Sequence, residues 1–111
     1  MSTESSADPM AEAMNRLWSK YLPQLEDRVI TLEKAANDLA KGNLTTTQRE
    51  AASSDAHKLA GVLGTFGLYE GTLLAREAEE AYNGNVAGNG ATAARLAEIA
   101  ATLRAVLASR S

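Results

Sequence analysis

Apolar residues recur at helical spacing in five segments of the chain, and none of its segments alternates with the period of a β-strand. The first segment runs from Pro9 to about Tyr21. In the second segment the apolar residues are spaced alternately four and three residues apart, and the segment ends near residues 41–43. Three further stripes predict helices over about 46–67, 69–82 and 91–108. The pattern therefore predicts an all-α chain.

Two prolines define the predicted first helix. Asp8 followed by Pro9 is a helix start, because the aspartate oxygen caps free backbone N–H groups and proline suits the first helical position. Pro23 disfavours helical dihedrals at Leu22 and removes one backbone donor. We therefore expect a break or kink near Pro23, which leaves the first helix short and separate.

The connection between the second and third predicted helices carries its own signals. Gly42 fits a left-handed residue just after a helix end. Thr45 with Gln48, or Thr47 with Glu50, forms a capping box that starts the next helix.

Four long amphipathic helices joined by short turns favour one architecture. They predict an antiparallel up-down four-helix bundle, with the short extra N-terminal helix as a lid over one end. The glycine- and asparagine-rich segment 83–90 is the clearest loop. Residues 1–8 are expected to form a disordered tail, and residues 9–110 the bundle domain.

Composition narrows the classes of function. The 111 residues are 45% hydrophobic, which suits one globular domain, and the net charge of −3 argues against nucleic-acid binding. No stretch is long and apolar enough to span a membrane, and there is no cysteine. The acidic pairs at 26–27 and 79–80 lack the further ligands of a metal site. We expect a monomeric, cytoplasmic protein that binds neither nucleic acid nor membrane.

The only histidine, His57, is the leading candidate for chemistry. On a helix, Ala60, Gly61 and Gly64 share its face, while a continuous apolar stripe lies opposite. Glycine inside a helix costs about 1 kcal/mol relative to alanine, so two of them call for a reason. A face cleared of side chains beside an exposed imidazole suits a nucleophile that another protein must approach. Close helix packing at the two glycines is the alternative explanation.

Polar residues around His57 are weaker candidates. Ser53 and Ser54 lie one turn before it and can bond phosphoryl oxygens, and Lys58 and Arg76 are possible counter-charges for a phosphate. Glu50 is placed to orient the ring. For each of them, solvated helix surface is the simpler interpretation.

The order of residues around His57 resembles the histidine-containing phosphotransfer (HPt) domain of two-component phosphorelays. In that family an apolar residue stands two residues after the histidine, a glycine stands four residues after it, and a second glycine stands ten residues after it. Here Leu59, Gly61 and Gly67 occupy these positions. The resemblance covers roughly residues 23 to 108. One position departs, because Ala60 stands where the family usually has lysine, and Lys58 lies about 100° around the helix from His57.

The resemblance implies a phosphorelay carrier. His57 would accept a phosphoryl group from a receiver-domain aspartyl phosphate or a histidine kinase and pass it to a response-regulator receiver domain. Six residues would serve docking or phosphate access: Ser53, Ser54, Lys58, Ala60, Gly61 and Gly64. The chain itself would need no cofactor, Mg²⁺ being expected on the partner receiver, and would have no autokinase activity.

Two other functions are weighed. A histidine kinase is disfavoured, because no nucleotide-binding motif is present and 111 residues leave no room for an ATP domain. A degenerate bundle that only binds other proteins stays open, since Ala60 replaces the family lysine.

Overall fold

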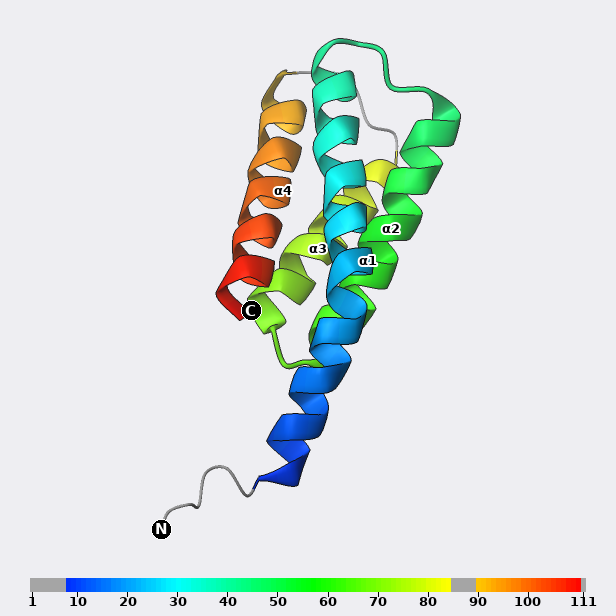
Figure 1. Cartoon of the computed structure of the whole chain (residues 1–111). Coiled ribbons are helices and arrows are strands. Elements are labelled where there is room, and N and C mark those ends of the chain that lie inside the picture. The colour runs from blue at the N-terminus through cyan, green and yellow to red at the C-terminus, as the bar shows by residue number, and fades with distance from the viewer. Residues whose placement is uncertain (1–7, 85–89, 111) are drawn as a thin grey trace.

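The computed structural model describes residues 8–84 and 90–110, which form four helices and no strand. The helices are α1 (Pro9–Ala40), α2 (Thr46–Thr65), α3 (Tyr69–Asn83) and α4 (Gly90–Arg110). Successive helices run in opposite directions, and α1 packs on α2 and α4 while α3 packs on the same two helices (Figure 1). The predicted all-α four-helix bundle is confirmed. Of the tail predicted over 1–8, residues 1–7 lie outside the described residues, as do residues 85–89 of the predicted loop, while Asp8 caps α1.

The predicted short N-terminal helix is not a separate element. α1 continues through Pro23 for 32 residues. Pro23 is exposed, whereas Trp18 before it and Leu25 after it are both buried against the bundle. Because both sides are held by packing and water can reach the carbonyl that loses its partner, the helix tolerates the missing donor.

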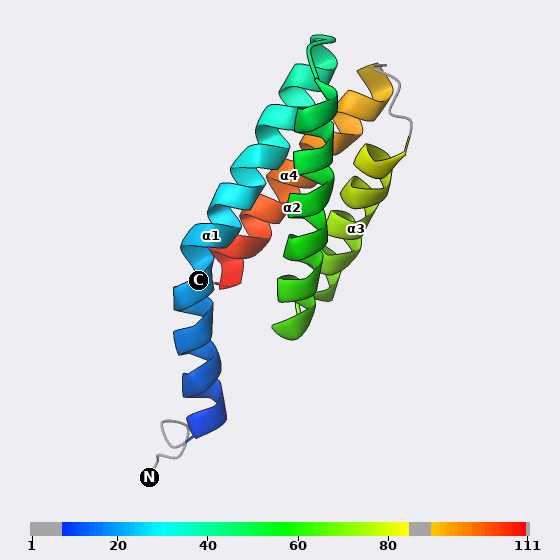
Figure 2. The same cartoon turned by 90° about the vertical axis from the view of Figure 1, so that its right-hand side faces the viewer.

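The beginning of α1 is also not a lid. Its first turns project beyond the other helices in two perpendicular views (Figures 1 and 2). Trp18 is the first buried residue, and its ring meets Phe66 edge-on with centroids 5.1 Å apart. The Arg110 guanidinium lies 5.2 Å from the Trp18 ring centre, so the end of α4 holds α1 where the projection begins.

The helix ends follow the sequence signals. The Asp8 carboxylate accepts from the backbone N–H groups of residues 10 and 11, at 3.1 and 3.2 Å. Thr45 and Gln48 form the capping box at the start of α2, in preference to Thr47 with Glu50. Gly42 and Gly67 have φ of +74° and +73° after the ends of α1 and α2, a conformation that favours glycine.

The core is built differently in the two halves of the bundle. α1 and α4 contribute mainly large aliphatic side chains, namely Leu25, Val29, Leu32, Leu39, Leu96, Ile99, Leu103 and Leu107. The buried positions of α2 and α3 include many small residues, namely Ala52, Ala56, Ala60, Gly71, Thr72, Ala75 and Ala78. Small side chains let α2 and α3 lie close together over their length. None of the described helices is long and apolar enough to cross a membrane.

Candidate functional site

His57 lies near the middle of α2 on the side that borders α3. Its side chain is 72% exposed, so the predicted exposure is confirmed. The opposite face of α2 holds it in place, because Ala52, Ala56, Leu59 and Leu63 are all buried. The predicted apolar stripe therefore anchors the helix, with only Phe66 at its end partly exposed.

One carboxylate orients the imidazole. The Nδ1 atom of His57 lies 2.9 Å from Oε2 of Glu79 on α3. A carboxylate only accepts hydrogen bonds, so this contact holds a proton on Nδ1. In the neutral ring, Nε2 then carries the lone pair, which makes it the nucleophilic atom of an exposed side chain.

The ring borders a shallow polar hollow of ≈ 390 Å³ between α2 and the end of α3. Its walls are Arg49, Glu50, Ser53, Ser54, His57, Glu79, Tyr82 and Asn83. The Ser53 hydroxyl donates to the Glu79 carbonyl at 3.4 Å. Burial raises the pKa of Tyr82 to about 12, so its hydroxyl stays protonated at neutral pH.

Arg49 supplies a positive charge at the rim of this hollow. Its Nη1 donates to the Tyr82 carbonyl at 2.6 Å and to the Gly84 carbonyl at 3.5 Å. These carbonyls lie at the C-terminal end of α3, where a cation is favoured by the helix dipole. Arg49 therefore ties the start of α2 to the end of α3 beside the histidine.

The two glycines of the His57 face differ. A Cβ added at Gly61 would meet nothing within 4 Å, so this position is open to an approaching protein. A Cβ at Gly64 would lie 3.5 Å from the Thr72 hydroxyl, which is ordinary contact. Close helix packing requires neither glycine. Gly71 is the tight position, where a Cβ would stand 2.9 Å from the Cδ1 of Leu63.

The expectation that Ala60 lies on the exposed face is wrong. Ala60 is 4% exposed and faces α3, and its carbonyl accepts the Thr72 hydroxyl at 3.3 Å. Ala60 lies three residues after His57, a rotation of about 300° or −60° around the helix, which is enough to move its side chain from the rim into the contact between the helices. Ala60 therefore belongs to the packing of α2 on α3 and offers no docking surface.

The remaining predicted residues lie at the surface. Ser54 and Glu50 are exposed at the hollow, and Glu50 makes no hydrogen bond to the ring among the described contacts. Lys58 and Arg76 are exposed, and neither forms an ion pair within the described part of the chain. Arg76 lies one turn before Glu79 on α3, which places it on the same side of that helix.

Sequence reasoning missed Glu79 and Arg49. Glu79 belongs to an acidic pair whose only considered role was metal binding, and no group of three or more metal-ligating side chains occurs in the described residues. Its contact with His57 depends on the register of α3 against α2, for which the sequence holds no local signal. In the sequence Arg49 likewise looks like an ordinary residue of the first turn of α2. Only the tertiary structure brings the end of α3 beside it.

Comparison with known proteins establishes the class. The family model for the Hpt domain matches residues 16–109, so the chain belongs to the Hpt domain family. The chain is also similar to a named protein, Protein RcaC from Microchaete diplosiphon, with 39% identity over 66 residues. That match covers 60% of this chain and 10% of RcaC. No solved structure matches the chain.

Proposed function

We propose that this chain is a phosphorelay carrier whose phosphoryl acceptor is Nε2 of His57. Membership of the Hpt family makes it a phosphotransfer protein in the general sense. The observation that carries the specific proposal is an exposed imidazole whose Nδ1 is bonded to Glu79 at 2.9 Å, which leaves Nε2 directed to other molecules.

The transfer balances with the groups at hand. Nε2 attacks the phosphorus of an aspartyl phosphate, the N–P bond forms, the P–O bond breaks, and the aspartate leaves as a carboxylate. The ring keeps its Nδ1 proton and becomes positively charged, and Glu79 stabilises that charge through a charge-assisted hydrogen bond. Passing the phosphoryl group to a second receiver reverses these changes.

In the proposed mechanism the chain supplies neither the phosphoryl group nor the Mg²⁺, so its partners supply them. We propose that the donor is a receiver-domain aspartyl phosphate or a histidine kinase, and that the acceptor is a receiver domain that brings its own Mg²⁺. In this proposal the chain needs no cofactor, has no autokinase activity and acts as a monomer in the cytoplasm. Arg76 is the best-placed cation to attract the incoming phosphoryl group, because it shares the Glu79 side of α3.

The test is phosphorylation of the purified chain by a receiver domain charged with labelled acetyl phosphate. Wild type should acquire an acid-labile, alkali-stable label, and His57→Gln should acquire none. Glu79→Gln is the matched variant, since it keeps shape but removes charge. It should accept label about fivefold to tenfold more slowly, because a neutral hydrogen bond contributes about 1 kcal/mol less than a charge-assisted one.

Three results contradict parts of this proposal. Label that persists in His57→Gln excludes His57 as the acceptor. Binding of the receiver without any label on wild type favours the degenerate interaction module. Label from ATP alone shows autokinase activity.

A further inference from the structure

We propose that Arg49 is a positioning residue for the transfer reaction, because its bonds to the last turn of α3 hold the Glu79 carboxylate where it fixes the protonation of His57. This inference rests on the proposed function and adds a residue that makes no hydrogen bond to the imidazole itself. Its starting point is the pair of bonds from Arg49 Nη1 to the carbonyls of Tyr82 and Gly84, at 2.6 and 3.5 Å.

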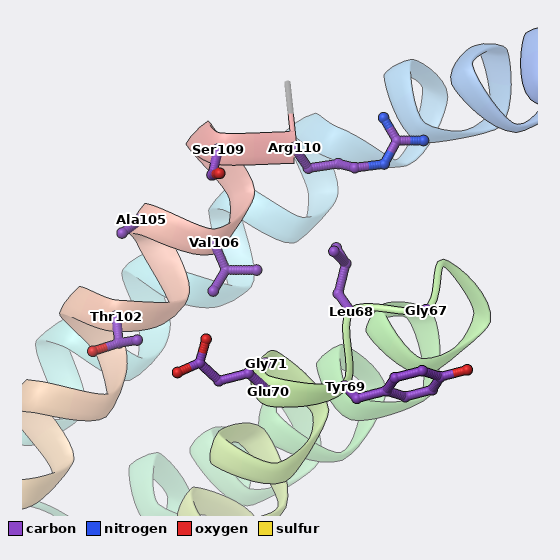
Figure 3. Close-up of a pocket in the computed structure, with 10 residues that line it drawn as sticks. All are labelled: Gly67, Leu68, Tyr69, Glu70, Gly71, Thr102, Ala105, Val106, Ser109 and Arg110. Atoms are coloured by element: carbon purple, nitrogen blue, oxygen red, sulfur yellow. The ribbon is translucent and has the colours of Figure 1, made fainter.

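The position of α3 beside His57 depends chiefly on its contact with α2. α3 packs far more closely on α2 than on α4. Between the start of α3 and the end of α4 a hollow of ≈ 640 Å³ remains, and the Glu70 side chain points toward α4 there (Figure 3). The ion pair of Glu77 with Arg95 links α3 to α4, but both side chains are exposed, so it contributes little. The distance from Glu79 to His57 is therefore set by what ties α3 to α2.

Three hydrogen bonds to backbone carbonyls tie α2 to α3 in one antiparallel register. Along α2 the bonded positions advance by four and then seven residues, while along α3 they go back by three and then seven. The two helices therefore stay aligned over the whole segment that contains the histidine and its carboxylate. The three bonds run from Arg49 to Tyr82, from Ser53 to Glu79 and from Thr72 to Ala60, at 2.6, 3.4 and 3.3 Å.

Arg49 is the charged donor of this set, and it acts at the end of α3 that needs a charge. Glu79 and Glu80 lie near the C-terminal end of α3, where the helix dipole disfavours carboxylates, and α3 has no basic residue in its last turn. The Tyr82 carbonyl is among the last four of the helix, which have no partner inside it. Arg49 supplies both the donor and the positive charge, so the turn that follows Glu79 is held by α2.

The bond between Glu79 and His57 tolerates little displacement. Its length of 2.9 Å is ordinary for a hydrogen bond, and a carboxylate moved away by about 1 Å no longer holds the Nδ1 proton. The neutral ring then exchanges between two tautomers, and in one of them Nε2 carries the proton and has no lone pair for phosphorus. Tyr82 lies three residues after Glu79 on the same side of α3, so a turn fixed at Tyr82 also fixes Glu79.

The experiment measures the tautomer and the chemistry separately. His57 is the only histidine, so the imidazole signals in a nitrogen–proton correlation spectrum belong to it alone. Arg49→Met removes the donor, and in the neutral ring it should shift the ratio of the two tautomers by about threefold or more toward protonated Nε2. Labelling by phosphoramidate, a small donor that needs no docking, should slow about twofold to fivefold. Arg49→Lys keeps a donor and the charge and should lie between Arg49→Met and wild type.

Arg28→Met is the matched control. Arg28 ties α1 to α2 through a 2.7 Å bond from its Nη1 to Asp55, two residues before His57. Its replacement removes a bond to α2 without touching the contact with α3, so the tautomer ratio and the labelling rate should keep their wild-type values. In a Glu79→Ala background, Arg49→Met should change neither quantity further, because the residue through which it acts is gone.

Each of three outcomes overturns the inference while the proposed function stands. A wild-type tautomer ratio in Arg49→Met means that any slower labelling comes from the charge acting on the donor directly. An equal shift in Arg28→Met means that the loss of any bond to α2 is sufficient. A further shift in the Glu79→Ala background means that Arg49 acts by another route. A wild-type chain that no receiver and no phosphoramidate can label overturns the proposed function, whereas the tautomer ratio still decides whether Arg49 positions Glu79.

Discussion

The two halves of the bundle use their buried residues for different purposes. α1 and α4 meet through large aliphatic side chains and an exposed ion pair between Glu33 and Arg104. α2 and α3 bury many small residues beside Leu59, Leu63 and Tyr82, and the Thr72 hydroxyl is bonded across their contact. Large side chains bury more apolar area per residue, whereas small ones bring two backbones close enough for surface groups on different helices to bond.

This difference explains where the candidate site lies. His57 and Glu79 come from different helices and still approach to 2.9 Å, with His57 exposed and Glu79 half-buried. A wide contact filled by leucine would hold the two helices further apart. The α1–α4 half therefore supplies most of the large buried side chains, and the α2–α3 half supplies the geometry of the histidine.

The largest expected effect tests the packing of the α1–α4 half. Leu25 is fully buried in α1, and Leu25→Ala should lower the free energy of unfolding by about 2–5 kcal/mol, because it loses burial and leaves a cavity. Urea denaturation measures the loss. Folded Leu25→Ala should still be labelled by phosphoramidate at the wild-type rate. A matching loss of labelling in protein that remains folded would show that the two halves are not separable.

A smaller effect tests the contact between α2 and α3. Ala60→Lys should destabilise the fold by about 1–3 kcal/mol, because a long side chain is forced into a tightly packed contact. Lys58→Ala, at an exposed position two residues earlier, is the control and should change stability by less than about 0.5 kcal/mol. Thermal unfolding distinguishes the two. Wild-type stability of Ala60→Lys would mean that the lysine reaches solvent along the contact.

The smallest stability change should accompany a large change in transfer. Gly61→Leu should stabilise α2 by close to 1 kcal/mol, since leucine is the better helix former and nothing lies within 4 Å of the new Cβ. Transfer from a phosphorylated receiver should be blocked, because the leucine stands where the partner must approach. Phosphoramidate labelling should be unaffected. Normal transfer from the receiver would show that the open position at Gly61 is not used for docking.

Much of the fold was predictable because its signals are local. The caps at Asp8 and Thr45 and the left-handed Gly42 each depend on a few neighbouring residues, and they were predicted from the sequence, Thr45 as one of two candidate capping boxes. The exposure of His57 follows from the apolar stripe on the other side of the same helix. Helical periodicity relates residues within one helix, so such features need no knowledge of the neighbours.

Three features were decided only by the tertiary structure. Pro23 interrupts no helix, because Trp18 and Leu25 are held by packing on either side of it. Ala60 is buried and Glu79 meets His57 because α3 lies against α2 in one particular register. The sequence by itself determined the apolar stripes and the caps at Asp8 and Thr45. How one helix sits against another depends on the fit of all the side chains between them, and that fit placed the carboxylate beside the histidine.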